Sequence, residues 1–218
     1  MHLSLQSLII RAFVLFTAMP IHECAHALVA SWLGDDTADA QGRLTLNPLS
    51  HLDLVGSLMI LVAGFGWAKP VPVNPLNFRR NGITMRGGMA LTAAAGPLSN
   101  LLLGFVFFLL SKLTWALTSL PIELSVIFLM VTQINIMLAV FNLLPVYPLD
   151  GGRIAGFFLP DRALAWMEEH GRAIQMVFMM LVLFTNILSA PLSFLQGKVL
   201  LGMDWLTSLG GLLPRLLG

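Results

Sequence analysis

Two long apolar runs, residues 89–111 and 122–144, occupy the middle of this 218-residue chain. Each can form a helix that crosses a bilayer, because a spanning helix needs about 20 mostly apolar residues. A third run, residues 5–33, has the same character and ends at Gly34. Only 11% of all residues are charged and 57% are hydrophobic, whereas soluble domains carry about 25% charged residues. The chain is therefore predicted to be an all-α, polytopic membrane protein.

The remaining segments predict further contacts with the membrane. Residues 54–67 are apolar but short and rich in glycine, which favours a re-entrant or interfacial piece over a full span. Residues 173–188 predict another span, and residues 192–213 a weaker one. The alternating pattern of residues 41–46, followed by a turn-forming Asn-Pro pair, predicts a short strand. We expect about four to six membrane segments, with a short interfacial β/loop region after the first helix.

Residues 1–218 are predicted to form a single domain, because no internal repeat or low-complexity segment divides them. Basic residues gather in the loops at 69–86 and 150–172. Since such residues concentrate on the cytoplasmic side of membranes, both loops are predicted to be cytoplasmic and the N-terminus extracytoplasmic. The net charge is only +1 and the chain has no Lys/Arg-rich tract, so nucleic acid is not an expected partner.

The first apolar run contains a cluster of polar residues, the H-E-x-x-H sequence formed by His22, Glu23 and His26. On a helix this spacing puts both imidazoles on one face, where they can bind one Zn²⁺ at about 2.0–2.1 Å with the glutamate beside them as a general base. The alternative is a chance match, or two buried histidines bonded to neighbouring helices. Polar residues inside an apolar span are costly without a function, which favours the metal site.

Asp150 is the best candidate for a third zinc ligand. A catalytic zinc binds three protein ligands and keeps one position open. Asp150 follows a stretch with two prolines and precedes two glycines, and an unwound backbone at membrane depth must line protein or a watery cavity. The alternative is a turn at the membrane surface, and the chemistry of the residues leaves both interpretations open.

Three elements together resemble the site-2 protease family of intramembrane zinc metalloproteases: residues 22–26, 95–100 and 142–151, in the family's order and spacing. The resemblance covers most of residues 15–155. It implies that Asp150, in a Leu-Asp-Gly motif, is the third ligand of one zinc ion per chain. The chain is similar to a compact form of the family, without the additional preceding helix and the PDZ domain that larger members carry.

The resemblance also implies an activity, the hydrolysis of peptide bonds within transmembrane segments of membrane proteins. Glu23 would accept the proton of the attacking water. Asn100 or Asn142 could supply an amide to the developing oxyanion, although interhelical hydrogen bonding is the alternative for either side chain. Substrates, by analogy, would be single-span proteins already trimmed by another protease, such as anti-sigma factors or remnant signal peptides.

The expected setting is a plasma membrane, with lipid around a family-like core of residues 5–155 and C-terminal membrane segments within residues 173–213. A substrate helix must unwind before it can be cut, and residues 41–46 and 71–74 are candidates for pairing with it by strand addition. Packing of these segments over the membrane surface is the alternative. The sequence does not specify an oligomeric state.

Two other function classes fit part of the pattern. A metal or solute transporter would use intramembrane His, Glu and Asp as a transit site, but the chain has no inverted repeat and Glu23 is placed for a base. A non-catalytic relative that only binds membrane proteins would not need an intact ligand set. His51 and Cys24 are expected to have structural roles rather than to bind metal.

Overall fold

The computed structural model describes residues 5–63, 66–117 and 120–209 of the chain. Every regular element within those residues is helical, so the predicted all-α fold is confirmed. The elements, in order, are α1 (Leu5–Phe13), the π turn η1 (Val14–Ala18), α2 (Met19–Trp32), α3 (Thr37–Ala40), the 3₁₀ turn η2 (Pro48–Ser50), α4 (Leu54–Ala63), the 3₁₀ turn η3 (Pro75–Asn77), α5 (Met85–Ala116), α6 (Ile122–Asn142), α7 (Asp150–Phe158), α8 (Asp161–Glu169), α9 (Gly171–Phe184) and α10 (Ser189–Leu209).

α1, η1 and α2 join into one long helix that carries the H-E-x-x-H sequence. At η1 the N–H of Met19 donates to the carbonyl of Val14, one residue further back than in an α-helix. This wider turn lies directly before Pro20, whose ring lacks an N–H and crowds the carbonyl four residues earlier. The segment Leu8–Trp32 is nevertheless long and apolar enough to cross a membrane.

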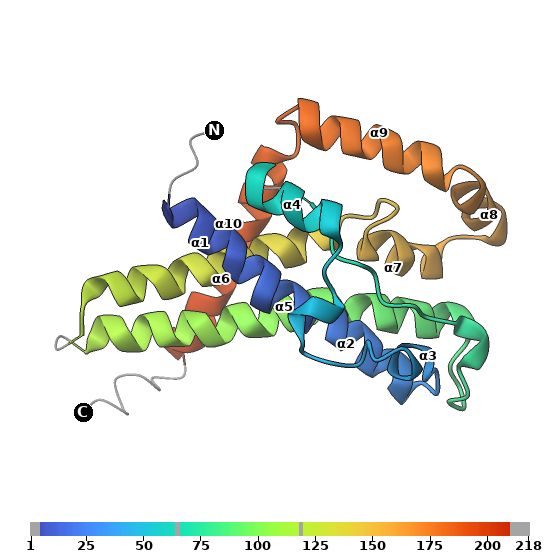
Figure 1. Cartoon of the computed structure of the whole chain (residues 1–218), viewed down its shortest axis with the longest axis horizontal. Helices are drawn as coiled ribbons and strands as arrows, with labels where there is room; N and C mark the ends of the chain where they lie inside the picture. Colours follow the sequence, from blue (N-terminus) through green and yellow to red (C-terminus); the bar gives the residue numbers. More distant parts are fainter. Residues whose placement is uncertain (1–4, 64–65, 118–119, 210–218) are drawn as a thin grey trace.

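α5 and α6 lie side by side and antiparallel along the long axis of the molecule (Figure 1). Gly104 allows this close approach, because a Cβ at that position would lie only 3.3 Å from the Cβ of Asn135 and 3.4 Å from the Thr132 carbonyl oxygen. α10 packs against the same pair. Together the three helices bury an apolar cluster made of Phe108, Ile136, Val140, Leu192 and Met203.

The number of membrane segments is lower than most of the predicted range. Three described helices can cross a membrane by length and composition: Leu8–Trp32, Met85–Ala116 and Ile122–Asn142. Gly171–Phe184 and Ser189–Ser208 pass only as a pair and are bent by 86° relative to each other. The predicted span at residues 173–188 is therefore not a helix that crosses alone, and four spans are reached only if this bent pair counts as one. The end of the predicted segment 192–213 lies outside the described residues.

The predicted strand at residues 41–46 is absent from the structure, which has turns and bends there. The chain instead closes on α3, since the N–H of Gly42 donates to Asp39 and that of Arg43 to Ala38. Gly42 adopts a φ of +64°, which favours glycine and interrupts an extended strand. An alternating pattern alone could not reveal this turn. α4, with 10 residues, is about 15 Å long and too short to span, as predicted for residues 54–67, although residues 64–65 lie outside the description.

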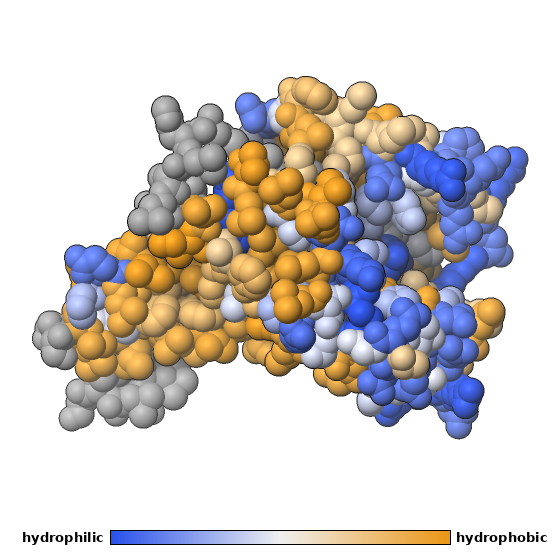
Figure 2. All heavy atoms as spheres, in the orientation of Figure 1, coloured by the Kyte–Doolittle hydropathy of each residue, from blue (hydrophilic) through white to orange (hydrophobic). Residues whose placement is uncertain are grey.

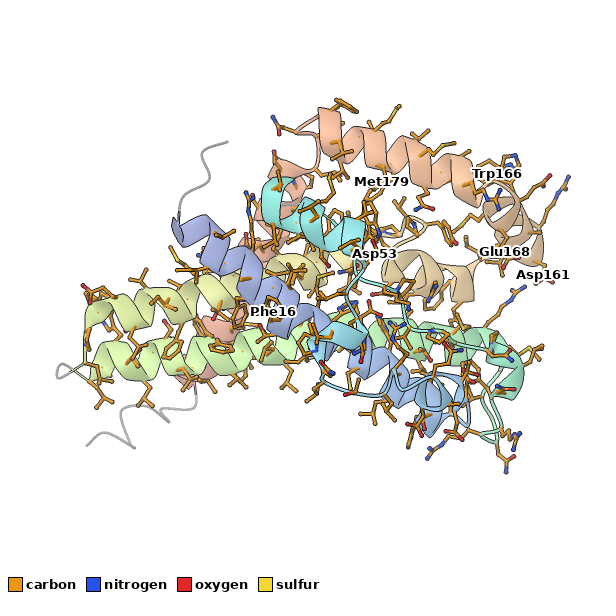
Figure 3. The ribbon with its side chains drawn as sticks, viewed as in Figure 1. Phe16, Asp53, Asp161, Trp166, Glu168 and Met179 are labelled. Carbon is orange, nitrogen blue, oxygen red and sulfur yellow. The ribbon has the colours of Figure 1, made fainter. Side chains whose placement is uncertain are left out.

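Polar and apolar side chains separate along the molecule. Figure 2 shows hydrophobic side chains over α1, α4 and much of α5 and α6, whereas hydrophilic ones gather at the end that contains α3 and α8. Asp161, Trp166 and Glu168 of α8 project at this polar end (Figure 3). The two basic loops predicted to share one side of the membrane both lie there.

Candidate active site

α2 presents His22 and His26 on one face, as the i, i+4 spacing predicts. Their rings lie edge to face with centroids 4.6 Å apart, and they are 9% and 8% exposed. Glu23 begins on the neighbouring face and is partly exposed. The helix thus buries the two imidazoles inside the protein and leaves the carboxylate less enclosed.

Asp150, at the start of α7, completes a compact cluster with these histidines. Its Oδ2 lies 3.1 Å from Nε2 of His22 and 3.4 Å from Nε2 of His26, and the two Nε2 atoms are 3.0 Å apart. Within the described part of the chain, these three residues form the one group of His, Cys, Asp or Glu side chains placed to share a metal ion. The structure therefore brings together the three predicted ligands from segments that are far apart in sequence.

The hydrogen bonds behind the histidines define which ring nitrogens carry protons. Nδ1 of His26 lies 2.7 Å from the carbonyl oxygen of Thr92, and Nδ1 of His22 lies 2.6 Å from Oδ1 of Asn100. Since these oxygens only accept hydrogen bonds, both Nδ1 atoms are the donors. In neutral rings both Nε2 atoms then carry lone pairs, and these point toward Asp150.

With neutral rings, three electron-pair donors therefore converge at this point. Oδ2 of Asp150 is buried and has no directed hydrogen-bond partner in the described residues, despite its short distances to the two imidazoles. Such a set repels itself unless a cation lies between its members. Ligands at about 2.0–2.1 Å from a tetrahedral zinc lie about 3.3 Å from one another, close to the observed spacing. The donor set therefore fits zinc.

Two glycines let α7 begin close to the end of α6. A Cβ at Gly151 would lie 2.3 Å from the carbonyl oxygen of Leu143, and one at Gly152 would lie 2.9 Å from the backbone nitrogen of Tyr147. Both are closer than real Cβ contacts, so larger residues would push α7 away. The glycines after Asp150 are needed to fold the carboxylate back toward α2.

α5 lines the other side of the cluster. A Cβ at Gly96 would lie 2.4 Å from Nε2 of His26 and 2.6 Å from Cε1 of His22, so only glycine allows α5 to approach the imidazoles. Asn100 lies one helical turn after Gly96 and is 1% exposed. Its Oδ1 accepts the hydrogen bond from Nδ1 of His22. Gly96 and Asn100, both within the element at residues 95–100, therefore lie directly against the histidines.

Asn135 on α6 belongs to the same hydrogen-bond chain and was not singled out from the sequence. Nδ2 of Asn100 donates to Oδ1 of Asn135 at 3.2 Å, and Nδ2 of Asn135 donates to the Val131 carbonyl at 2.9 Å. Asn135 is fully buried. The signal that could have found it is a lone amide in an apolar helix, which needs an interhelical partner.

Glu23 is held from outside the cluster. Its Oε2 accepts a hydrogen bond from the backbone N–H of Val71 at 3.0 Å. Val71 is buried, and its side chain packs with Ala27 and Ala38. Among the contacts of the described residues, Oε1 of Glu23 has no partner, so one carboxylate oxygen is fixed and the other is available.

Three other polar residues lie apart from the ligand cluster. Nδ2 of Asn142 donates to the carbonyl of Leu138 in its own helix at 2.9 Å. His51 is buried and its Nε2 lies 2.8 Å from the Thr45 carbonyl. Cys24 is a free, partly exposed thiol. The structural roles expected for His51 and Cys24 stay predictions.

Comparison with known proteins gives a consistent set of matches. Residues 116–185, which include Asp150, match the family model described as peptidase family M50. "Putative zinc metalloprotease YwhC" of Bacillus subtilis (strain 168) is 46% identical over 167 residues, which are 74% of this chain and 73% of that protein. "Putative zinc metalloprotease Rip2" of Mycolicibacterium smegmatis is 30% identical over 167 residues, covering 73% of this chain and 62% of that protein. No solved structure gives a significant match.

Proposed function

Because this chain belongs to peptidase family M50, the site-2 proteases, and is a zinc metalloprotease of the membrane, we propose that it hydrolyses peptide bonds within the transmembrane segments of other membrane proteins. The observation that carries this proposal is the convergence of Nε2 of His22, Nε2 of His26 and Oδ2 of Asp150 in one cluster. Both histidines and the neighbouring Glu23 lie on a helix able to cross the membrane. The membership agrees with the zinc-dependent hydrolase predicted from the H-E-x-x-H sequence.

We assign one zinc ion per chain to Nε2 of His22, Nε2 of His26 and Oδ2 of Asp150. When bound, zinc supplies the Lewis acidity that lets water lose a proton near neutral pH. Asn100 and the Thr92 carbonyl keep the two imidazoles in the tautomer that turns Nε2 inward. Such partners behind a ligand typically change metal affinity by about 10–100-fold.

Glu23 is the proposed general base. Its Oε2 is occupied by the N–H of Val71, so Oε1 is the oxygen that accepts the proton of the attacking water and later returns it to the leaving nitrogen. Its partial exposure keeps the carboxylate reachable, while the two imidazoles beside it stay enclosed.

The oxyanion-stabilising amide proposed for Asn100 or Asn142 remains a prediction. Both amides are engaged in this structure, Asn100 with Asn135 and Asn142 with Leu138. The bond from His22 gives Asn100 a second role, as the group that orients this ligand.

The backbone beside Glu23 offers a place for an unwound substrate. Pro70 and Pro72 carry no N–H. The N–H of Val71 donates to Glu23, whereas the N–H of Val73 has no partner among the described contacts. We propose that an extended substrate pairs with residues 71–74 by strand addition. Residues 41–46, the other candidate, form a turn and offer no straight edge.

We further propose a single plasma-membrane domain over residues 1–218, surrounded by lipid, with the loops at 69–86 and 150–172 in the cytoplasm and the N-terminus outside. The two loops both lie at the polar end of the molecule, which supports their placement on the same side of the membrane (Figure 2). The proposed substrates are single-span proteins trimmed beforehand, such as anti-sigma factors or remnant signal peptides.

The test compares the purified parent with its Glu23→Gln variant. Both are expected to hold about one zinc per chain, and only the parent is expected to cleave a model transmembrane peptide. Zinc is measured by elemental analysis and cleavage by mass spectrometry of the products. Zinc that exchanges freely in both proteins, with no cleavage by either, would instead favour a transporter.

A further inference from the structure

A short extended segment crosses the site next to the general base. Residues 69–74 are here called the strap. Positions 70 and 72 are prolines and alternate with other residues. The backbone N–H of Val71 is the one donor to Glu23 in the described structure. A glutamate has several rotatable bonds, so this single N–H determines where the carboxylate lies.

The two ends of the strap are fixed by buried groups. At its start, the N–H of Lys69 donates to the carbonyl of His51 at 2.9 Å. At its end, the N–H of Asn74 donates to Oδ2 of Asp35 at 2.6 Å. Asp35 is fully buried, and His51 is 1% exposed. The strap is thus held at both ends by residues that precede it by many positions in the sequence.

Arg43 binds the first two residues of the strap from the side. Its guanidinium Nη2 donates to the carbonyl of Lys69 at 2.6 Å and, more weakly, to that of Pro70 at 3.4 Å. Arg43 is 6% exposed, and none of the ion pairs of the described residues includes it. A buried guanidinium that faces only carbonyl groups is costly, so its position calls for a function.

One peptide group connects Arg43 to Glu23. The carbonyl oxygen of Pro70 faces the guanidinium, and the N–H of the same peptide, on Val71, donates to the carboxylate. A cation at the oxygen end polarises the peptide and strengthens the hydrogen bond at its N–H end. We propose that Arg43 is a positioning residue for Glu23, which acts through the strap and the Pro70–Val71 peptide group.

This inference rests on the proposed function, in which Glu23 is the base. It predicts a loss of turnover without a loss of metal, because Arg43 contacts neither a ligand nor the ligands' partners in the described structure. Arg43→Met removes the donors and keeps a long side chain, whereas Arg43→Lys restores one donor. We expect Arg43→Met to lower kcat by about tenfold or more, with KM within about twofold and zinc content unchanged. Arg43→Lys should recover most of the lost kcat.

A second pair of variants tests the N–H directly. Val71→Pro deletes the donor to Glu23, whereas Val71→Ala keeps that N–H and shortens the same side chain. Position 71 lies between two prolines, where the backbone tolerates a further ring. Because the side chain of Val71 packs in an apolar cluster, Val71→Ala reports the effect of losing that packing alone. Val71→Pro should lose about tenfold or more in kcat relative to Val71→Ala.

Each result decides between distinct conclusions. Equal loss in Val71→Pro and Val71→Ala, or loss of zinc together with activity in Arg43→Met and in Arg43→Lys, would show that the strap is only structural. Parental kcat in Val71→Pro, alongside an inactive Glu23→Gln, would overturn the positioning role but leave the proposed protease intact. An active Glu23→Gln variant would overturn the proposed base itself. If Arg43→Met does not fold, the two Val71 variants decide alone.

Discussion

The ligand cluster and the strap meet at Glu23 but are built in different ways. The ligands lie on helices, with His22 and His26 one turn apart on α2 and Asp150 at the start of α7. The strap has no regular secondary structure. Its backbone N–H groups donate to Asp35 and to the His51 carbonyl, and its carbonyl groups accept from Arg43. Helical packing therefore positions the proposed metal ligands, and individual polar contacts position the proposed base.

This difference predicts two classes of variant. Changes to the cluster should remove zinc and activity together, because the ligand atoms share one small space. Changes around the strap should leave zinc in place and affect turnover or stability. The following variants test that division, beginning with the largest expected effect.

Asp150→Ala should abolish both zinc binding and cleavage. Two imidazoles alone leave a zinc site without its third ligand and its neutralising charge, so zinc content should fall below about one tenth of the parental value. Elemental analysis and a peptide-cleavage assay measure the two effects. Asp161→Ala is the matched control, since Asp161 also begins a helix but lies exposed and pairs with Arg86. Parental zinc content in Asp150→Ala would remove this residue from the ligand set.

Gly96→Ala should weaken zinc binding by about a hundredfold, because overpacking of this kind costs about 1–3 kcal/mol. The added methyl group would lie within 2.6 Å of both imidazoles and must displace them. A competition titration with a zinc chelator measures the affinity. Gly202→Ala on α10 is the control, as a Cβ there meets nothing within 4 Å. Equal affinities in the two variants would contradict the close approach of α5.

Asn100→Ala should lower zinc affinity by about tenfold, the lower end of the range for groups behind a metal ligand. Its loss frees Nδ1 of His22 but leaves the helix that carries this histidine unchanged. Asn142→Ala, measured in the same titration, should leave the affinity unaltered. A selective fall in kcat for Asn142→Ala, with zinc retained, would instead identify Asn142 as the oxyanion donor.

Asp35→Asn should produce the smallest effect, a fall in Tm of a few degrees near pH 7. Burial alone would raise the pKa of Asp35, but hydrogen bonds from Thr37, Asn77 and Asn74 outweigh it and lower that pKa below its usual value. A carboxylate with a lowered folded-state pKa stabilises the protein above the unfolded-state pKa of about 3.9. This stabilisation is lost as the pH falls through the lower, folded-state value.

The difference in Tm between parent and Asp35→Asn should therefore stay constant from about pH 5 to 8 and shrink below about pH 4. Thermal unfolding in detergent across this range measures it. Asp39→Asn is the control, since Asp39 is exposed on the neighbouring α3. A pH-independent difference would mean that Asp35 acts through shape and hydrogen bonding alone, without its charge.

Some features followed from the sequence because they depend on local spacing. Apolar runs of sufficient length predicted spans at residues 5–33, 89–111 and 122–144. The corresponding helices are Leu8–Trp32, Met85–Ala116 and Ile122–Asn142. The i, i+4 separation alone predicted that His22 and His26 share a helix face. The role of Asp150 could not be derived in this way. Its chemistry left a surface turn equally open, and the family resemblance was needed to prefer the metal.

Other features depend on contacts between distant segments. An alternating pattern at residues 41–46 resembles a strand, but the left-handed turn at Gly42 and the inward side chain of Arg43 form a loop instead. The apolar segments predicted at residues 173–188 and 192–213 likewise lie on helices bent by 86° relative to each other, an angle that neither segment's composition indicates. Periodicity reports which residues prefer to be buried and contains no information on where the partner segments lie.

The sequence by itself determined the membrane class, the shared helix face of His22 and His26 and the position of Glu23 next to them, because hydrophobic length and helical spacing are properties of neighbouring residues. The tertiary structure alone decided the convergence of Asp150 with the histidines, the Asn100–Asn135 support behind His22 and the hold of Val71 on Glu23. Each of these is a contact between groups far apart in the chain. Their distances depend on how helices and loops pack, which no local pattern encodes.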